Sequence, residues 1–153
     1  MDFQLNLDSE SIGHSFSTDI VEVPPTQSLQ DVIDQLSATK QGCALVCDDG
    51  RLVGLFTERD ALAAMASDAD FSKPVSASMV NPVTVTTAEP MANAITKMST
   101  GGFRQLPVVD ADGKPLGLLK VSCILNYFVQ HFPTTIYTLP PDPDRVPPTR
   151  EGA

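Results

Sequence analysis

Thr57 and Asp60 stand three residues apart at the start of an expected helix near residues 58–67. This spacing is typical of a helix N-terminus, where the hydroxyl caps a backbone amide and the acid favours the positive end of the helix. A carboxylate can also accept hydrogen bonds from two neighbouring hydroxyl groups of a ligand. Arg104 adds a guanidinium, which pairs with phosphate oxygens through two hydrogen bonds but at a surface often meets only water. For Thr57 and Asp60, capping and ligand binding both remain open, and for Arg104 a solvated side chain and ligand binding both remain open.

The sequence has no group of residues typical of catalysis. It contains no nucleophile paired with a base, no Walker-type glycine loop and no cluster of metal ligands. The two histidines, His14 and His131, are far apart, and neither lies beside a cysteine or an acidic cluster. We therefore expect no enzyme activity, no catalytic residue, no metal site and no required cofactor.

Composition and charge exclude several classes of protein. The 153 residues suffice for one compact domain. The formal net charge of −9 argues against binding nucleic acid, which needs a basic surface. No apolar run approaches the roughly 18–20 residues that span a membrane, and the first residues lack the basic stretch of a signal peptide. The three cysteines form no C-x-x-C pair. We expect a cytoplasmic protein with free thiols, and neither nucleic acid nor a membrane as its partner.

One pattern occurs twice in the chain. Residues 20–24 match residues 82–86 at an offset of 62. At the same offset, apolar residues spaced i, i+3, i+4 and i+7 predict one buried face of a helix in each copy. These residues are Leu29, Val32, Ile33 and Leu36 in the first copy, and Met91, Ala94, Ile95 and Met98 in the second. Ser28, three residues before Asp31, predicts the start of the first helix, and Pro90 that of the second.

Two hairpins and two closing helices complete the repeats. The turns Asp49-Gly50 and Asp112-Gly113 each lie between two apolar runs, which predicts a β-hairpin in each copy. Further helices are expected near residues 58–67 and 122–132. One such unit is too small to be secure alone. The sequence therefore predicts an α+β fold in which two pseudo-symmetric βαββα repeats pack sheet to sheet as one compact module.

The predicted boundaries are an N-terminal arm at 1–16, a first repeat at 17–70, a second repeat at 71–131 and a proline-rich tail at 132–153. The arm is either a short added strand or disordered. The tail holds six of the 13 prolines, which favours an extended chain over a packed helix. Two alternatives stay open: its apolar residues anchor the tail to the body or to a neighbouring chain, or the tail is disordered.

Two stretches resemble the recurrent motifs of CBS domains. Residues 54–60, Gly-Leu-Phe-Thr-Glu-Arg-Asp, are similar to the motif that closes a CBS domain, and residues 103–110, Phe-Arg-Gln-Leu-Pro-Val-Val-Asp, are similar to the family's other recurrent stretch. Both occur in register within the duplicated pattern, over about residues 17–130. The chain is therefore identified as a member of the family of tandem CBS pairs, or Bateman modules, here as a stand-alone protein.

The resemblance implies two clefts between the repeats, each able to hold an adenosyl ligand such as AMP, ADP, ATP or S-adenosylmethionine. In the first cleft, Asp60 is expected to bind the ribose hydroxyls and Thr57 to face the phosphates. Arg104 is expected to reach the same cleft from the second repeat. Ser78 and Val83, at the opening of the second repeat, are expected to flank the adenine.

The second cleft lacks these polar residues. Lys120 stands where the family has Ser or Thr, Cys123 stands in place of the Asp, and Gly42 aligns with Arg104. We therefore expect one nucleotide per chain. Weak binding at Lys120, or binding of a different ligand, stays open for the second cleft.

The function that the resemblance implies is a regulatory sensor with an adenine nucleotide as its regulatory ligand. A homodimer through the apolar helix faces is expected, and the signal would pass through that dimer or to an effector protein that the sequence does not identify. The alternative is a protein-interaction scaffold that uses the CBS fold without any ligand.

Overall fold

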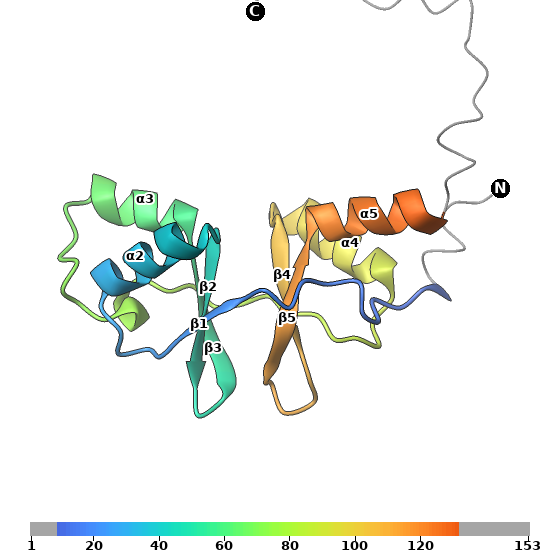
Figure 1. Cartoon of the computed structure of the whole chain (residues 1–153), viewed down its shortest axis with the longest axis horizontal. Coiled ribbons are helices and arrows are strands. Elements are labelled where there is room, and N and C mark those ends of the chain that lie inside the picture. Colours follow the sequence, from blue (N-terminus) through green and yellow to red (C-terminus); the bar gives the residue numbers. More distant parts are fainter. Residues whose placement is uncertain (1–8, 132–153) are drawn as a thin grey trace, which may run out of the picture.

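The computed structural model describes residues 9–131 (Figure 1). The elements in chain order are β1 (Val21–Val23), α2 (Leu29–Thr39), β2 (Cys43–Asp48), β3 (Arg51–Thr57), α3 (Glu58–Ala66), the 3₁₀ turn η1 (Val75–Ala77), α4 (Met91–Gly101), β4 (Gln105–Val109), β5 (Pro115–Lys120) and α5 (Val121–His131). The predicted α+β fold with two repeats is confirmed. The tail, residues 132–153, and the first eight residues of the arm lie outside the described residues.

The first repeat is built on a three-stranded sheet. β1 runs parallel to β2, with Val23 beside Val46, and β2 and β3 form an antiparallel hairpin. Asp49 and Gly50 have φ angles of 49° and 77°, which is the geometry that a two-residue hairpin turn requires. Both α2 and α3 lie on the outer face of this sheet (Figure 1). They enclose a core that includes Leu29, Val32, Phe56 and Ala61.

The second repeat differs at its first strand. β4 and β5 form the predicted hairpin, but the stretch that matches β1 is reduced to one parallel bridge between Val85 and Val108. The Val85 amide donates to the Pro107 carbonyl at 3.0 Å, and the Val109 amide donates to the Val85 carbonyl at 2.9 Å. Pro107 of β4, which aligns with Leu45 of β2, has no amide hydrogen to donate to the Val83 carbonyl, so the parallel ladder cannot extend back from Val85. Val85 and Val108 each lie 62 positions after Val23 and Val46, so the bridge keeps the register of the first repeat, but its ladder is shorter.

The two sheets face each other in the middle of the molecule, with the helices outside (Figure 1). Between the sheets, Cys43, Leu45 and Leu55 of the first repeat pack against Leu118 of the second in a shared apolar cluster. The Leu52 amide also donates to the Gly113 carbonyl at 3.0 Å, which joins the two hairpins. The repeats therefore share a core and form one module.

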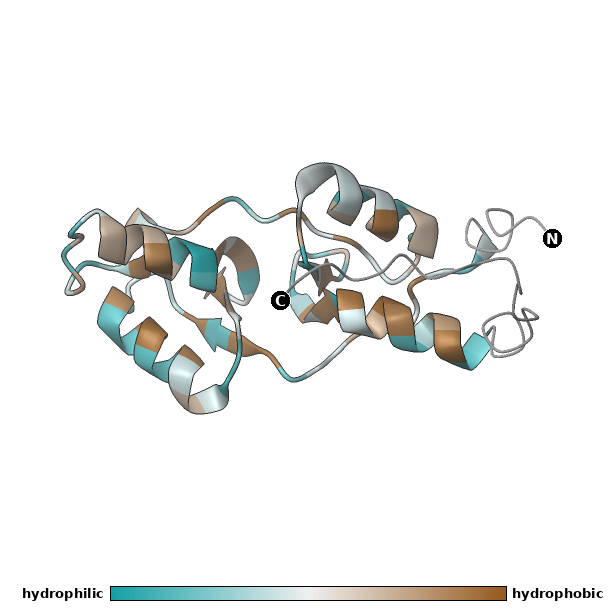
Figure 2. Cartoon of the chain, turned by 90° about the horizontal axis from the view of Figure 1, so that it is seen from above, coloured by the Kyte–Doolittle hydropathy of each residue, from teal (hydrophilic) through white to brown (hydrophobic). Residues whose placement is uncertain are grey.

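Two segments cross between the repeats, and we refer to residues 9–17 and 71–80 as the crossing segments. Figures 1 and 2 show them passing between the two halves of the molecule. The first crossing segment packs with the second repeat before the chain enters the first: Ile12 is fully buried in the core under α4 and α5. The second does the reverse, because Val75 is fully buried in the core of the first repeat.

The crossing segments add equivalent pairings to the two sheets. Ser17 exchanges both backbone hydrogen bonds with Leu118 of β5, at 2.9 and 2.8 Å. Sixty-three residues on from Ser17, Val80 does the same with Leu55 of β3, at 2.9 Å each way. Each sheet is thus completed by a segment that leads into the other repeat, an exchange that the sequence analysis did not predict.

Candidate functional site

Thr57 and Asp60 form the reciprocal cap of α3. The Asp60 amide donates to the Thr57 hydroxyl at 3.5 Å, while the Thr57 amide and hydroxyl donate to Oδ2 of Asp60 at 2.8 and 2.9 Å. Both side chains are half-buried. No donor among residues 9–131 reaches the other carboxylate oxygen, Oδ1. The cap that the spacing predicted is therefore present, and it leaves one oxygen of Asp60 available to a ligand.

Arg104 occupies the position equivalent to Gly42. The Val121 amide donates to the Arg104 carbonyl at 3.1 Å, just as the Glu58 amide donates to the Gly42 carbonyl at 3.1 Å in the first repeat. The structure thus places the two residues as the sequence alignment did. The Arg104 side chain is exposed, and within the described part of the chain no acidic group pairs with it. Its guanidinium is available to an anion.

Ser78 and Val83 lie on the stretch that leads into the second repeat. Ser78 ends the turn η1 and is half-buried, while Val83 is exposed. The antiparallel bridge between Leu55 and Val80 brings this stretch beside β3. Since Ser78 comes two residues before Val80 and Thr57 two residues after Leu55, both lie at the same end of that pairing. The bridge therefore brings the Ser78 backbone close to the cap of α3.

The thiol of Cys43 lies within electrostatic reach of a charged residue from each repeat. Cys43 pairs with Thr57 across the β2–β3 ladder and is 1 % exposed. The pKa of this thiol is raised to about 12: burial has the largest effect, the carboxylate of Asp60 also raises the pKa, and the ammonium of Lys120 lowers it. Asp60 of the first repeat and Lys120 of the second therefore act on one buried group. No local sequence signal indicates this arrangement, because it depends on how the two sheets pack.

Lys120 is held in a chain of hydrogen bonds that crosses between the repeats. Its ammonium donates to Oε1 of Gln41 at 3.3 Å, and the Gln41 amide donates to Oδ2 of Asp19 at 2.9 Å. We call Asp19, Gln41 and Lys120 the polar bridge. The sequence analysis named Lys120 and Gly42 at this cleft but missed Gln41 and Asp19. No motif marks these two residues, and they lie 79 and 101 positions from Lys120.

A hollow of about 230 Å³ lies beside the second cleft, between the first crossing segment and α5. Ser15 and Cys123 both line it. By the 63-residue offset, Ser15 is equivalent to Ser78 and Cys123 is equivalent to Asp60. The positions that correspond to Ser78 and Asp60 therefore line one hollow on this side of the molecule. No Asp, Glu, Lys or Arg side chain lines this hollow.

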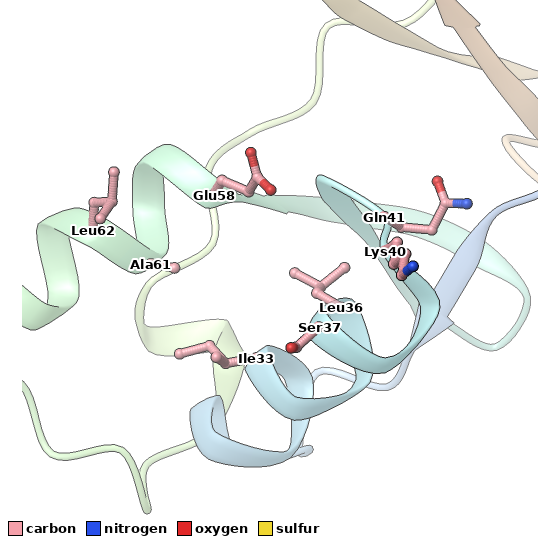
Figure 3. A pocket seen from close by; sticks show the side chains of 8 residues that line it. All are labelled: Ile33, Leu36, Ser37, Lys40, Gln41, Glu58, Ala61 and Leu62. Atoms are coloured by element: carbon pink, nitrogen blue, oxygen red, sulfur yellow. The ribbon is translucent and has the colours of Figure 1, made fainter.

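A larger hollow of about 550 Å³ lies between α2 and α3 (Figure 3). Ile33, Leu36 and Ala61 give it an apolar floor, and Lys40 and Glu58 stand at its edge. None of the predicted ligand residues lines it. The groove is therefore not the predicted ligand site, and that Thr57, Asp60 and Arg104 share one cleft stays a prediction.

Two further classes of function find no support within residues 9–131. No three side chains of His, Cys, Asp or Glu gather there as they would around a metal ion. None of the helices in that range is both long and apolar enough to cross a lipid bilayer.

Comparison with known proteins identifies the repeats. The sequence model of the CBS domain matches the chain twice, at residues 12–67 and 75–130. The solved structure of the CBS domain protein PAE2072 from Pyrobaculum aerophilum, complexed with AMP, is 25 % identical with a TM-score of 0.71, covering 79 % of this chain and 99 % of that one. The structure of CBSX2 in complex with AMP is 28 % identical with a TM-score of 0.70, covering 78 % and 96 %.

Among curated sequences, an uncharacterised 17.7 kDa protein of Acidianus ambivalens is 31 % identical over 107 residues, which is 69 % of this chain and 65 % of the relative. The matched regions span between 22 % and 65 % of the length of the four curated relatives.

Proposed function

The chain belongs to the CBS domain family, and on this basis we propose that it is a regulatory module that binds an adenosyl ligand, such as AMP, ADP or ATP, in one of its two inter-repeat clefts. Two solved CBS proteins, 25 % and 28 % identical to this chain, are described in complex with AMP, and the match covers almost the whole length of each. In this chain, the polar residues that such a ligand needs are concentrated in the first cleft.

The observation that carries this proposal is that the two carboxylate oxygens of Asp60 differ in their hydrogen-bond partners. Oδ2 holds the cap of α3, while Oδ1 has no donor within residues 9–131. In the proposed complex, Oδ1 accepts from the ribose hydroxyls without cost to the cap. The Thr57 hydroxyl and the first amides of α3 lie beside the phosphate, where the positive end of a helix favours an anion. Arg104 binds the phosphate from the second repeat.

Such a ligand would contact both repeats, and it would regulate the module by favouring one arrangement of the repeats. Thr57 and Asp60 belong to the first repeat, whereas Arg104 belongs to the second, so a bound nucleotide favours the inter-repeat arrangement in which all three reach it. We propose that a homodimer or a separate effector protein in the cytoplasm reads this change, and that the module itself catalyses no reaction.

A ligand-free scaffold is the second candidate, and the complete cap favours it. Thr57 and Asp60 satisfy each other without any ligand, so their presence alone is explained by the stability of α3. On that reading the chain would present its surface to a partner protein, and no adenosyl compound would affect it.

Thermal unfolding with AMP, ADP, ATP or S-adenosylmethionine distinguishes the two candidates. Ligand at 100 times its dissociation constant stabilises the protein by about 2.7 kcal/mol, a shift of several degrees for a domain of this size. We expect such a shift with the wild type and none with Asp60→Ala. Ser28→Ala is the matched control, because it removes the N-cap of α2, at a cost of about 1 kcal/mol, away from the cleft. It should keep the full shift.

Arg104→Ala tests the phosphate contact separately. We expect it to weaken AMP binding and to leave adenosine binding unchanged, since adenosine has no phosphate. If folded wild-type protein shows no shift with any of the four compounds, the sensor proposal fails and the scaffold is favoured.

A further inference from the structure

An exposed apolar stripe runs along α5. Val121, Leu125 and Val129 recur every four residues, so they lie on one face of the helix. Their side chains are 41 %, 58 % and 48 % exposed, so no element within residues 9–131 covers them. We call these three residues the α5 stripe. Contiguous apolar surface of this kind marks a place where another segment or protein binds.

The α5 stripe connects the end of the described chain with the groove between α2 and α3. α5 starts in the middle of the molecule and runs outward to His131 (Figure 1). Lys120 directly precedes α5, and its ammonium donates to Gln41 at 3.3 Å. Gln41 lines the groove of about 550 Å³. The inner end of the groove therefore lies about one lysine side chain away from the start of α5.

The groove continues the apolar surface into the first repeat. Ile33, Leu36 and Ala61 form its floor, and Leu62, which is 66 % exposed, also lines it (Figure 3). The stripe and the groove follow one another from the outer end of α5 to α3. A segment that comes from His131 can therefore bury apolar side chains along this whole route.

The C-terminal tail begins at the outer end of α5 and is long enough to follow this route. α5 has 11 residues and a length of about 16 Å. Pro133, two residues after His131, cannot continue the helix. Five extended residues span about 17 Å and eight span about 26 Å. A tail that turns back at His131 therefore passes α5 within residues 132–136 and brings residues 137–139 to the groove.

The composition of the tail suits this route. Residues 132–141 contain no charged side chain, and Ile136, Tyr137 and Leu139 stand at the distance that reaches the groove. The first repeat is acidic, because residues 17–70 hold ten acidic and three basic residues, a net charge of −7. An uncharged segment meets no repulsion there and loses no ionic hydration when it is buried. Tyrosine can bury its ring while its hydroxyl stays at a polar edge, as Lys40 and Glu58 provide in this groove.

We propose that the C-terminal tail of the same chain lies along the α5 stripe and places Ile136, Tyr137 and Leu139 in the α2–α3 groove. Because the tail is attached to α5, its effective concentration at the groove is roughly millimolar, so a few apolar contacts suffice to hold it. The bound tail covers the face on which the family resemblance leads us to expect a second copy, so the two compete. The proposal does not depend on nucleotide binding.

A single tryptophan in the full chain tests this contact. The sequence contains no tryptophan, so Tyr137→Trp introduces the only one, and tryptophan emits at shorter wavelength in apolar surroundings than in water. We expect Tyr137→Trp to emit at shorter wavelength than the reference variant Arg150→Trp, which lies beyond the bound segment. The difference should be the same at all protein concentrations, because the contact forms within one chain. Adding Leu62→Glu or Leu125→Glu should move the emission to that of the reference, because each places a charge in the contact.

Leu116→Glu is the matched control. Leu116 is an exposed leucine of β5 that lies outside the stripe and the groove, so its substitution should leave the emission of Tyr137→Trp unchanged. Circular dichroism checks that the variants fold, which is expected because all three leucines are exposed. Four results would each overturn the proposal. These are equal emission of Tyr137→Trp and Arg150→Trp, a shift to longer wavelength on dilution, no response to either Leu62→Glu or Leu125→Glu, and an equal response to Leu116→Glu.

Discussion

Cys43 has the most unusual surroundings of any single residue in the described part of the chain. Its thiol lies in the apolar cluster between the two sheets, within electrostatic reach of both Asp60 and Lys120. Because a thiolate at this position would lose its hydration, the pKa of the thiol lies far above its ordinary value, and the thiol stays protonated up to a correspondingly higher pH. The residue therefore reports on the contact between the repeats through its own titration.

Stability should fall at alkaline pH partly because of Cys43. Its pKa is about 12 in the folded chain and 9.0 when unperturbed. Between these values the unfolded chain has released the proton that the folded chain keeps, so unfolding becomes more favourable as pH rises. Below about pH 9 the group contributes no pH dependence. The measurement is urea unfolding of wild type and Cys43→Ala between pH 8 and pH 11.

We expect the free energy of unfolding to fall more steeply with pH in the wild type than in Cys43→Ala. Burial also raises the pKa of Cys47, to about 11, and of Tyr127, to about 12, so both proteins keep some slope. Equal slopes would mean that Cys43 is hydrated and that the sheets do not enclose it.

The sequence predicted single residues well where their partners are local. The Thr57–Asp60 cap and the Ser28 cap each act over three positions, so spacing alone indicates them. It missed Gln41 and Asp19, because their contact with Lys120 exists only after two sheets have packed face to face. That Asp60, Arg104 and Ser78 act on one ligand stays a prediction.

At the scale of the elements, the crossing segments explain two glycines. A Cβ on Gly117 of β5 would overlap the Ser17 carbonyl oxygen and the Phe16 ring. At the equivalent position, a Cβ on Gly54 of β3 would overlap the side chain of Met79. Both strands need glycine because a crossing segment lies directly over them.

Gly117→Ala should therefore be more destabilising than Gly54→Ala. At Gly117 the added methyl meets backbone, which can move only with the whole segment, whereas at Gly54 it meets a flexible methionine side chain that can turn away. We expect losses of about 2–3 kcal/mol and about 1 kcal/mol, from the usual cost of overpacking. Urea unfolding of the two variants measures the difference. An equal loss at both positions would show that neither segment is held tightly over its strand.

The elements themselves were predicted from periodicity, since each helix and hairpin is a local pattern. The crossing segments were not, because residues 9–17 and 71–80 carry no strand or helix pattern of their own. Their place is decided by the burial of Ile12 and Val75 in cores formed by distant residues. The shortened first strand of the second repeat, by contrast, has a cause visible in the sequence, because Pro107 of β4 has no amide hydrogen to donate to it.

At the scale of the whole molecule, the two clefts that the family resemblance predicts differ in their polar residues. In the first, Arg104 is unpaired within the described residues and Asp60 keeps one free oxygen. In the second, Lys120 is already engaged in the polar bridge with Gln41 and Asp19. A ligand entering the second cleft would have to displace those hydrogen bonds and would find no carboxylate for its ribose at Cys123.

We therefore expect one adenosyl ligand per chain in isothermal titration calorimetry. Asp60→Ala should abolish the binding, whereas Lys120→Met, the matched variant of the second cleft, should keep both affinity and stoichiometry. Lys120→Met should lose about 1 kcal/mol of stability, because it removes one hydrogen bond between the repeats. Two ligands per chain, or a loss of binding in Lys120→Met, would contradict this assignment of the clefts.

The crossing segments also describe a relation between this chain and a simpler assembly. Two separate copies of one repeat, each lending its leading segment to the other, would have the same pairings as Ser17 with Leu118 and Val80 with Leu55. That assembly is a domain-swapped dimer. In this chain a covalent link joins the two halves, so the exchange depends no longer on protein concentration but on the effective concentration that the link imposes. Neither repeat, cut out between α3 and η1, would carry the segment that completes its own sheet.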